Sequence, residues 1–599
     1  MKKTMKRSNA ETLPGTPSLT WRERLRQSRV ALAVCGLALA VYSRSLFCGF
    51  VRDDFPQIVN NPQVQSWRYL SQILTSHLWS HMAGYHTLFY RPLFSLWMLV
   101  IHTLGGLSPW FWHLSSISLH VACTYLVYRV SQRLIGSEVG AGVAAAFFAV
   151  HPIHVEAVTW VSASNELLFS LLLLSAMLIL LAPQGRGNAW PILLSAALYF
   201  IGLFAKETGA ALIVLLIAMA WMRLKDRETN RSKRLLLAGI PYVAATVAYL
   251  IIRWSAMQAV GIEKGEHSWR EVFFSGPSIL LFYLRKMMVP VGLSGGYMNP
   301  LDSSPTMAFW LALAAILFFV LLMTWLALRR NQVFGFSGAL ILLPVLPALA
   351  AVRIYPQGDM THDRYLYLPS VGLCLLIGAV AQRIVKAPTS ARIAFASVLA
   401  IVLVAFSAAT FAQQRFFDND VVFLQREIDV DPANALAYGL LGNVYMDQGK
   451  TDLALKTYSI ASALAPDDPK ITLFLVRGLF AEQKYAEAEA ILNRLLLRKD
   501  FDATRQNAIR LSLANVDIAL GKLDAAQQLL QQVEQADAKF PELHWALGVL
   551  YQKEGQVTQA QAQFEKEYQL NGDEMAHQQS ILLLKQILSR TPASAGTRN

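Results

Sequence analysis

Two adjacent carboxylates, Asp53 and Asp54, follow the first long apolar run of the chain. Charge beside lipid is unfavourable, so an acidic pair at a membrane edge favours a functional role. One carboxylate could act as a general base that takes the proton of an attacking hydroxyl, as an inverting sugar transfer requires, while the second orients it, binds the acceptor or holds a metal. The alternative is a solvated loop or a helix-capping pair. We interpret Asp53 and Asp54 as the candidate catalytic residues.

A second group of histidine and glutamate side chains comprises His151, His154, Glu156 and Glu166. These residues could meet the acidic pair across a cavity, as an acceptor-binding or second-carboxylate cluster. They could equally hold a divalent cation such as Mg²⁺ or Mn²⁺, because His and Glu ligate many divalent ions. A third interpretation is that they are interfacial polar residues that finish helix ends, and the spacing alone leaves all three open.

Basic residues near the membrane surface are candidates for binding a phosphate, because a departing lipid phosphate needs cations to take up its charge. The candidates are Arg91, Lys206, Arg353 and Arg364. Each could instead be a snorkelling residue or part of an internal ion pair, for example Lys206 with Glu207. No P-loop, GxGxxG or GxSxG motif stands in a suitable strand–helix context, which argues against direct use of ATP or dinucleotides.

The composition indicates that these residues are positioned by membrane helices. Hydrophobic residues make up 54% of the 599 and charged residues only 16%, against roughly 25% charged in soluble proteins. Long apolar runs dominate residues 29–412, whereas 415–599 read as an ordinary soluble sequence. The net charge of +13 comes from short basic segments beside the apolar runs. That pattern is typical of cytoplasmic loops and not of a nucleic-acid-binding protein.

About eleven apolar runs approach the roughly 20 residues that a spanning helix needs. The predicted spans are 30–50, 110–131, 138–151, 166–182, 189–205, 208–222, 235–255, 305–328, 335–351, 366–382 and 392–412. Placing every basic loop in the cytoplasm satisfies the parity of crossings between neighbouring loops. Two further stretches, 88–104 and 276–293, would each break this parity if they crossed the membrane alone. We therefore expect them to lie at the outer interface or to dip into it. The count puts the acidic pair and everything after Phe411 on the outer side.

The C-terminal part predicts a tetratricopeptide solenoid of about four 34-residue repeats. Small and large residues occupy the signature positions around Gly442 and recur around Gly548. Such solenoids present a concave surface to proteins or peptides. The fold class is therefore all-α, a polytopic membrane domain followed by an α-solenoid. The predicted divisions are a cytoplasmic basic tail at 1–29, the membrane domain at 30–414, a linker at 415–434, the repeats at 435–575, and a C-terminal helix and flexible tail at 576–599.

Several short motifs occur in order along the chain: the acidic pair, HPIHVEAV, FAKE, YLRKMMVPVGLS, HDRYLYLPS and the terminal repeats. Together they resemble the transmembrane and tetratricopeptide repeat O-mannosyltransferases and their bacterial relatives, within the C-type glycosyltransferases. The resemblance implies a polyprenyl-phosphate-linked sugar as donor, an outward-facing active site, and Asp53 as the catalytic base beside Asp54. The only glycosylation sequon begins at Asn230, in a predicted cytoplasmic loop. A bacterial inner membrane, with the active site in the periplasm, is therefore expected.

Three functions compete. The first is a glycosyltransferase that moves a sugar, of mannose type by resemblance, to a hydroxyl of a protein recruited by the repeats. The second is a non-catalytic, membrane-anchored scaffold for envelope assembly, which would not need so many spans. The third is a lipid or glycan transporter, for which a polar path through the membrane is expected. Carboxylates gathered in one outer cavity would favour the enzyme.

Overall fold

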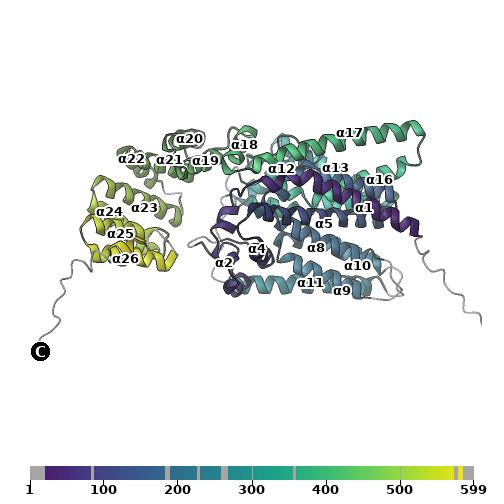
Figure 1. Ribbon diagram of the computed structural model, residues 1–599, viewed down its shortest axis with the longest axis horizontal. Coiled ribbons are helices and arrows are strands. Elements are labelled where there is room, and N and C mark those ends of the chain that lie inside the picture. The colour runs from purple at the N-terminus through teal and green to yellow at the C-terminus, as the bar shows by residue number, and fades with distance from the viewer. Residues whose placement is uncertain are drawn as a thin grey trace, which may run out of the picture.

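The computed structural model describes residues 21–82, 87–182, 189–224, 230–257, 267–299, 301–354, 359–498, 501–571 and 578–583. Within these ranges the fold is helical, and the one β feature is an isolated bridge between Tyr297 and Thr361. A bundle of long helices, purple to green, is followed by a solenoid of paired helices, green to yellow (Figure 1). The predicted all-α fold class is confirmed.

The bundle is built from helices that coincide with the predicted apolar runs. They are α1 (Trp21–Tyr42), α5 (Pro109–Ile135), α6 (Glu138–Val150), α8 (Asn165–Leu180), α9 (Trp190–Leu203), α10 (Ile213–Arg223), α11 (Arg231–Ala256), α13 (Met307–Arg329), α14 (Val333–Leu342), α15 (Leu346–Ala351), α16 (Pro369–Ile384) and α17 (Thr389–Gln413). The run predicted at 335–351 is thus divided between α14 and α15. The run at 208–222 begins with a 3-10 segment, Glu207–Leu212.

Among the residues that the structure describes, six helical segments are long and apolar enough to cross a membrane, and a seventh is added if the bent pair Glu138–Val150 and Pro152–Thr159 is one span. The outward faces of α11, α13 and α17 carry exposed aliphatic side chains, such as Ile251, Leu321 and Val404. Exposed apolar surface of this extent indicates lipid contact. The protein is therefore a membrane protein, and the larger number of about eleven spans stays a prediction.

The first helix differs from its predicted bounds, since it begins at Trp21 and ends at Tyr42 instead of covering 30–50. Its end is set by buried polar contacts. The backbone N–H of Ser45 donates to Oε1 of Gln414 at 2.8 Å, so it is not available for a helical bond. Residues Ser43–Phe47 form a 3-10 turn instead. The end of α1 is thereby tied to the end of α17.

Small residues bring the central helices close together. A Cβ atom added at Gly378 of α16 would lie 2.5 Å from the carbonyl oxygen of Gly140 of α6. A Cβ at Gly372 would meet the carbonyl oxygen of Ser337 in α14, also at 2.5 Å. Backbones in van der Waals contact are the usual way in which membrane helices pack, because burial against lipid gives little hydrophobic driving force.

Short elements gather at the end of the bundle that faces the solenoid (Figure 1). They are α2 (Pro62–Gln65), α3 (Leu70–Thr75), α4 (Pro92–Gly105) and α7 (Val155–Thr159), with 3-10 or π turns between them. The stretches predicted to lie at the interface form α4 and α12 (Trp269–Met288), and neither is among the six candidate spans. Whether they cross the membrane stays a prediction.

The solenoid consists of α19 (Ala435–Asp447), α20 (Thr451–Leu464), α21 (Pro469–Ala481), α22 (Tyr485–Leu496), α23 (Ala503–Leu520), α24 (Leu523–Ala536), α25 (Leu543–Lys553) and α26 (Val557–Asn571). These are four antiparallel pairs, as the repeat spacing predicts. Gly442 packs directly on the ring of Tyr458, and a Cβ at Gly548 would lie 2.7 Å from Phe564. The small and large signature residues therefore meet within their own repeats.

The predicted linker at 415–434 is mostly helical. It contains a 3-10 turn, Gln414–Phe417, and the helix α18 (Asp420–Val430). Phe423 and Leu424 of α18 are buried in the same core cluster as the bundle. The apolar residues of α18 lie on one face, and this face packs on the membrane domain. The chain then continues into α19. Of the predicted C-terminal helix, residues 578–583 are described and helical, whereas the tail at 584–599 and the N-terminal residues 1–20 lie outside the described residues.

Candidate active site

The acidic pair lies in a tight turn directly after α1 and its 3-10 extension. Arg52 has a φ of 53°, in the left-handed region that few side chains adopt. The N–H groups of Asp54 and Phe55 donate to the carbonyl oxygens of Val51 and Arg52 at 3.0 and 3.1 Å. The turn therefore points two neighbouring carboxylates, those of Asp53 and Asp54, into different surroundings.

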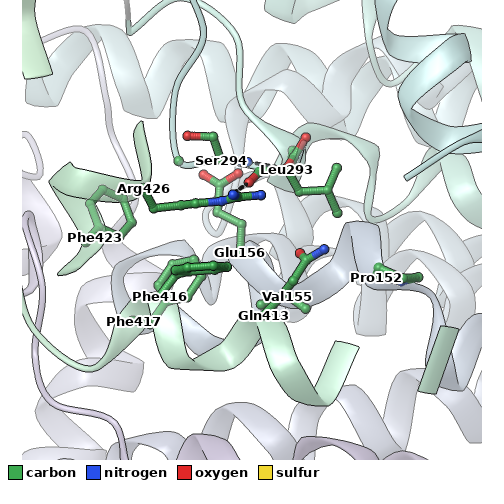
Figure 2. A pocket seen from close by; sticks show the side chains of 12 residues that line it. Pro152, Val155, Glu156, Leu293, Ser294, Gln413, Phe416, Phe417, Phe423 and Arg426 are labelled. Atoms are coloured by element: carbon green, nitrogen blue, oxygen red, sulfur yellow. Dashed lines mark hydrogen bonds between the residues drawn. The ribbon is translucent and has the colours of Figure 1, made fainter. Parts of the chain in front are cut away.

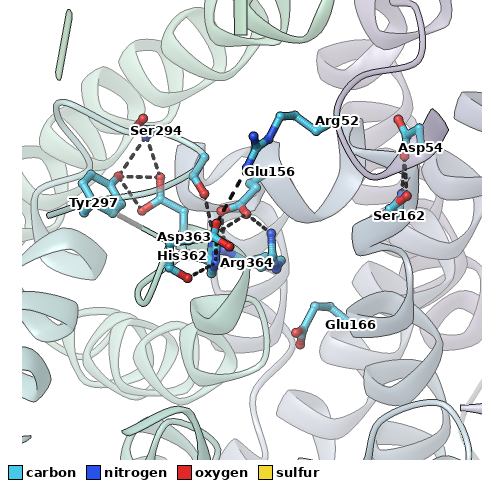
Figure 3. Close-up of polar contacts among 12 residues, drawn as sticks. Arg52, Asp54, Glu156, Ser162, Glu166, Ser294, Tyr297, His362, Asp363 and Arg364 are labelled. Carbon is cyan, nitrogen blue, oxygen red and sulfur yellow. Dashed lines mark hydrogen bonds and ion pairs between the residues drawn. The ribbon is translucent and has the colours of Figure 1, made fainter. Parts of the chain in front are cut away.

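Asp54 is fully buried and saturated with hydrogen bonds. Its Oδ1 accepts from the N–H and the hydroxyl of Ser162 at 2.8 and 2.6 Å, and its Oδ2 accepts from the N–H of Val51 at 3.1 Å (Figure 3). Burial raises the pKa of Asp54 to about 7, although these hydrogen bonds oppose the shift. The side chain ties the acidic turn to the loop before α8, and it does not line the cavity described below.

Asp53, in contrast, lines a cavity of about 330 Å³ at the end of the bundle. Its pKa is raised by burial, with the cations of Arg52 and Arg364 opposing the rise and Asp359 adding to it. A cavity of this volume is within the range of small-molecule sites. The lining side chains that carry a formal charge are Arg52, Asp53, Arg91, Glu166, Lys206, Asp359, Arg364 and Lys470.

Arg364 is held in the cavity wall by Glu156. The Nη1 atom of Arg364 donates to Oε1 of Glu156 at 2.7 Å, and the backbone N–H of Arg364 donates to Oε2 at 2.9 Å (Figure 3). The guanidinium lies over the ring of Trp160, 4.7 Å from its centroid. His362 approaches the same Glu156 at 3.5 Å. The carboxylate of Glu156 thus fixes the orientation of Arg364, and the arginine still lines the cavity.

Two other cations of the cavity, Lys206 and Arg91, are also paired. Lys206 donates to Glu166, and both side chains are almost fully buried. Arg91 makes two bonds to Glu207, Nη2 to Oε1 at 2.6 Å and Nε to Oε2 at 2.9 Å. The pairing considered from the sequence, Lys206 with its neighbour Glu207, is therefore wrong. Each of the two residues pairs with a residue of another segment. Lys206 has an extended backbone just before the 3-10 segment Glu207–Leu212, and in extended backbone successive side chains point in opposite directions.

Besides Asp54, four predicted residues do not line the cavity: Glu156 contacts Arg364 of its wall, and His151, His154 and Arg353 lie farther away. His151 accepts a bond from the N–H of Ile153 at Nδ1, so its Nε2 carries the proton and donates to the carbonyl of Met287 at 3.0 Å. His154 packs between the rings of Phe148 and Tyr367. Arg353 lies over Trp269, at the start of α12. The two histidines serve helix packing, and Arg353 has no place in the cavity wall that the structure describes.

Several polar residues of the site carried no clear signal in the sequence. Asp359 faces Arg52 at 3.8 Å, and Lys470, from the second repeat, lines the same cavity. Glu427 of α18 is buried near Arg52, and burial raises its pKa to about 7. Lys470 and Glu427, which follow the membrane helices in the chain, thus contribute to the site. The spacing of residues within the membrane part could not indicate this contribution.

A second, smaller cavity of about 20 Å³ lies beneath α18, between the loop at 293–295 and the segment at 413–417 (Figure 2). Arg426 of α18 reaches across it and donates from Nε to the carbonyl of Leu293 at 3.1 Å. Asp363 on its wall accepts bonds from the hydroxyl of Tyr297 at 2.8 Å and from the N–H of Ser294 at 3.2 Å. Burial and the charge of Glu156 raise the pKa of Asp363 to about 8. The volume suits about one water molecule.

No group of three or more His, Cys, Asp or Glu side chains is arranged to hold a metal ion among the residues for which placement is given. Three members of the predicted cluster each have a partner of their own: His151 has Met287, Glu156 has Arg364 and Glu166 has Lys206. This grouping therefore does not form the divalent-cation site considered from the sequence.

The fold and the site define a polytopic membrane protein whose tetratricopeptide solenoid adjoins a charged cavity. A tetratricopeptide-repeat profile matches residues 445–513 and 517–566. Over 605 residues the chain is 24% identical to the human protein O-mannosyl-transferase TMTC3, a match that covers 90% of this chain and 64% of that relative. It is 26% identical over 463 residues to the Caenorhabditis elegans protein O-mannosyl-transferase F38B6.6, covering 76% of this chain and 65% of that relative.

These matches confirm the predicted resemblance: the chain is a relative of protein O-mannosyl-transferases, and it carries tetratricopeptide repeats. The chain spans slightly less than two thirds of the length of these two relatives. Among solved structures it is similar to that of ArnT from Cupriavidus metallidurans bound to undecaprenyl phosphate, at 14% identity and a TM-score of 0.38. That alignment covers 78% of this chain and 80% of that one.

Proposed function

We propose that this protein transfers a sugar from a polyprenyl-phosphate donor to a hydroxyl group of a protein, on the outer face of a membrane. The observation that carries the proposal is the cavity in which Asp53 faces fixed cations, at the end of the bundle next to the solenoid. The named activity of the relatives supports the reaction class. By resemblance the sugar is of mannose type, the transfer inverts the anomeric centre, and the membrane is a bacterial inner membrane.

In this proposal Asp53 is the general base. Its carboxylate accepts the proton of the acceptor hydroxyl while that oxygen attacks the anomeric carbon and forms the new C–O bond. The bond between the anomeric carbon and the phosphate oxygen breaks, and polyprenyl phosphate leaves with the electron pair. A pKa raised by burial makes Asp53 a stronger base than an exposed aspartate. Asp54 is then a positioning residue that holds the turn through Val51 and Ser162.

Arg91, Lys206 and Arg364 are proposed to take up the charge of the departing phosphate. All three line the cavity and are held by acidic partners, so their positions are set before the donor arrives. Fixed cations aimed at developing charge stabilise a transition state without reorganisation. Arg353 is not part of this group, because it lies over Trp269 outside the cavity.

The solenoid is proposed to recruit the acceptor protein. Its described helices α21, α23 and α25 line a groove of about 650 Å³. Phe480, Tyr485 and Trp545 supply aromatic surface there, with Arg477 and Lys553 among the polar lining residues. Aromatic side chains on a concave solenoid suit an extended peptide.

The test is transfer by the full chain in nanodiscs, with polyprenyl-phosphate-mannose, a nucleotide sugar, or neither, and an unfolded Ser/Thr-rich protein as acceptor. Glycosylated product with the lipid-linked donor alone is the expected result. Transfer from the nucleotide sugar would contradict the proposed donor class. Movement of the lipid-linked sugar between leaflets, without product, would favour the transporter instead.

A further inference from the structure

The helix α18 lies directly over the acidic turn. Two segments of the bundle end, the acidic turn with the residues just before it and the loop at Met298, make three backbone contacts with residues at or beside this helix. The N–H of Gly49 donates to the carbonyl of Asp418 at 3.2 Å, and the N–H of Arg52 donates to Oδ1 of Asp420 at 2.6 Å. The N–H of Met298 donates to Oδ2 of Asp431 at 2.9 Å. These are bonds to main-chain groups, so they fix the path of the loops.

The bond from Arg52 falls at the residue whose backbone is in the left-handed region. An arginine there is strained, and its conformation persists only if surrounding contacts hold it. Asp420 holds the N–H, and the guanidinium of Arg52 lies 6.0 Å from the ring centroid of Phe423 on the same helix. The helix α18 therefore bonds to the backbone of Arg52 and lies beside its guanidinium, which also faces Asp359 at 3.8 Å.

The next residue along the chain is Asp53. A change of φ at Arg52 rotates everything that follows it, so the direction of the Asp53 carboxylate depends on the same bond. Asp54 anchors the far side of the turn through Ser162. The carboxylate proposed as the base is thus fixed between two supports, Ser162 in the membrane domain and Asp420 on α18, the helix that leads into the solenoid.

From these contacts we infer that Asp420 is a positioning residue for Asp53, and that α18 makes the solenoid a structural part of the catalytic site. The role in catalysis rests on the proposed function, whereas the contact itself does not. Asp420 touches neither substrate nor the reacting atoms; it acts through the backbone of Arg52. A carboxylate in this place accepts the N–H, and a side-chain amide oxygen could do the same.

The test compares Asp420→Ala and Asp420→Asn with Asp429→Ala, which removes an exposed carboxylate from the same helix. Hydrogen–deuterium exchange of the full chain in nanodiscs gives the first readout, at the peptide that covers residues 50–58. We expect exchange about tenfold faster in Asp420→Ala, and close to wild type in the other two, since one protecting hydrogen bond is lost. Unchanged exchange in Asp420→Ala would overturn the inference, whether or not the protein transfers sugar.

The second readout is steady-state transfer. Asp420→Ala should lower kcat about tenfold with little change in the KM for the donor lipid, because a base is misplaced while the phosphate-binding cations remain. Asp420→Asn should restore most of the turnover. Faster exchange with unaltered kcat would show that Asp420 does not position the base. A wild type without any transfer would refute the proposed function alone, and the exchange experiment would still decide the contact.

Discussion

At the scale of single residues, the turn at Arg52–Asp54 separates two carboxylates that are adjacent in sequence. Asp53 lines the charged cavity, whereas Asp54 accepts three hydrogen bonds in a site without solvent exposure. Their surroundings give them different roles. An aspartate that already accepts from Val51 and Ser162 has little capacity to take a proton from a substrate, and its neighbour in the cavity has that access.

The protonation of Asp54 predicts a stability profile. Its pKa is raised by burial from 3.8 to about 7 in the folded state, so the folded protein binds more protons than the unfolded chain between those values. This group therefore lowers stability as pH rises from about 4 to about 7, and not below. Asp54→Asn cannot titrate and should flatten that part of the profile of Tm against pH in detergent. An equally steep profile in the variant would contradict the assignment.

The protonation of Asp53 predicts a rate profile. A base must be ionised, so kcat/KM should rise with pH through the pKa of Asp53, which burial raises above the ordinary 3.8. Removing the opposing cation with Arg364→Gln should move the acidic limb to higher pH, because Arg364 favours the charged form. The initial rate of transfer against pH gives both profiles. A shift to lower pH in the variant would be inconsistent with this electrostatic arrangement.

At the scale of elements, close backbone contact between α6 and α16 holds the bundle that supports the site. A Cβ at Gly378 would lie 2.5 Å from a backbone oxygen of Gly140, which cannot move away as a flexible side chain can. Gly378→Ala should destabilise the protein by about 1–3 kcal/mol through overpacking. Thermal unfolding in detergent measures the effect.

The matched control is Gly36→Ala in α1, where an added Cβ has no atom within 4 Å. It should leave Tm unchanged or raise it slightly, since alanine favours helix over glycine. Equal losses in both variants would mean that the destabilisation is not caused by contact between the two helices.

Much of the architecture followed from the sequence because it depends on local pattern. Apolar runs located the bundle helices, and the Gly442 and Tyr458 positions located a repeat whose residues do meet. The end of α1 could not be predicted, because a side chain distant in sequence, Gln414, takes the N–H of Ser45. The ion pair of Lys206 with Glu166 could not be predicted for the same reason, because Glu166 is distant in sequence. The spacing of residues in the sequence predicts which side chains are neighbours along one helix. The ion pairs that line a cavity join separate segments, so spacing does not predict them.

The site was predicted in part. Asp53, Glu166, Arg91, Lys206 and Arg364 do come together around one cavity. Asp359, Asp420 and Glu427 could not be identified as site residues from the sequence. Their place beside Arg52 depends on α18 folding over the acidic turn. The sequence predicts a linker at 415–434, and only tertiary packing reveals the buried face of α18.

At the scale of the whole molecule, the acidic turn and the solenoid lie at the same end of the bundle (Figure 1). Charge parity predicts that this end faces away from the cytoplasm. In a chain without its native cysteines, a cysteine at Ser459 of the solenoid should react with a membrane-impermeant maleimide in spheroplasts. A cysteine at Asn230, before α11, should react only after lysis. The reverse pattern would invert the proposed topology.

In the proposed reaction, Asp53 is the base of a transfer from a lipid-linked sugar. The most direct test of this role is the single-turnover rate of sugar transfer by Asp53→Asn in nanodiscs, beside Asp452→Asn, which neutralises an exposed acid of the solenoid. Loss of a general base should slow the Asp53 variant by about a hundredfold or more while donor binding persists. The control should retain the wild-type rate. Transfer by Asp53→Asn at the rate of the wild type would contradict the assignment of Asp53 as the base.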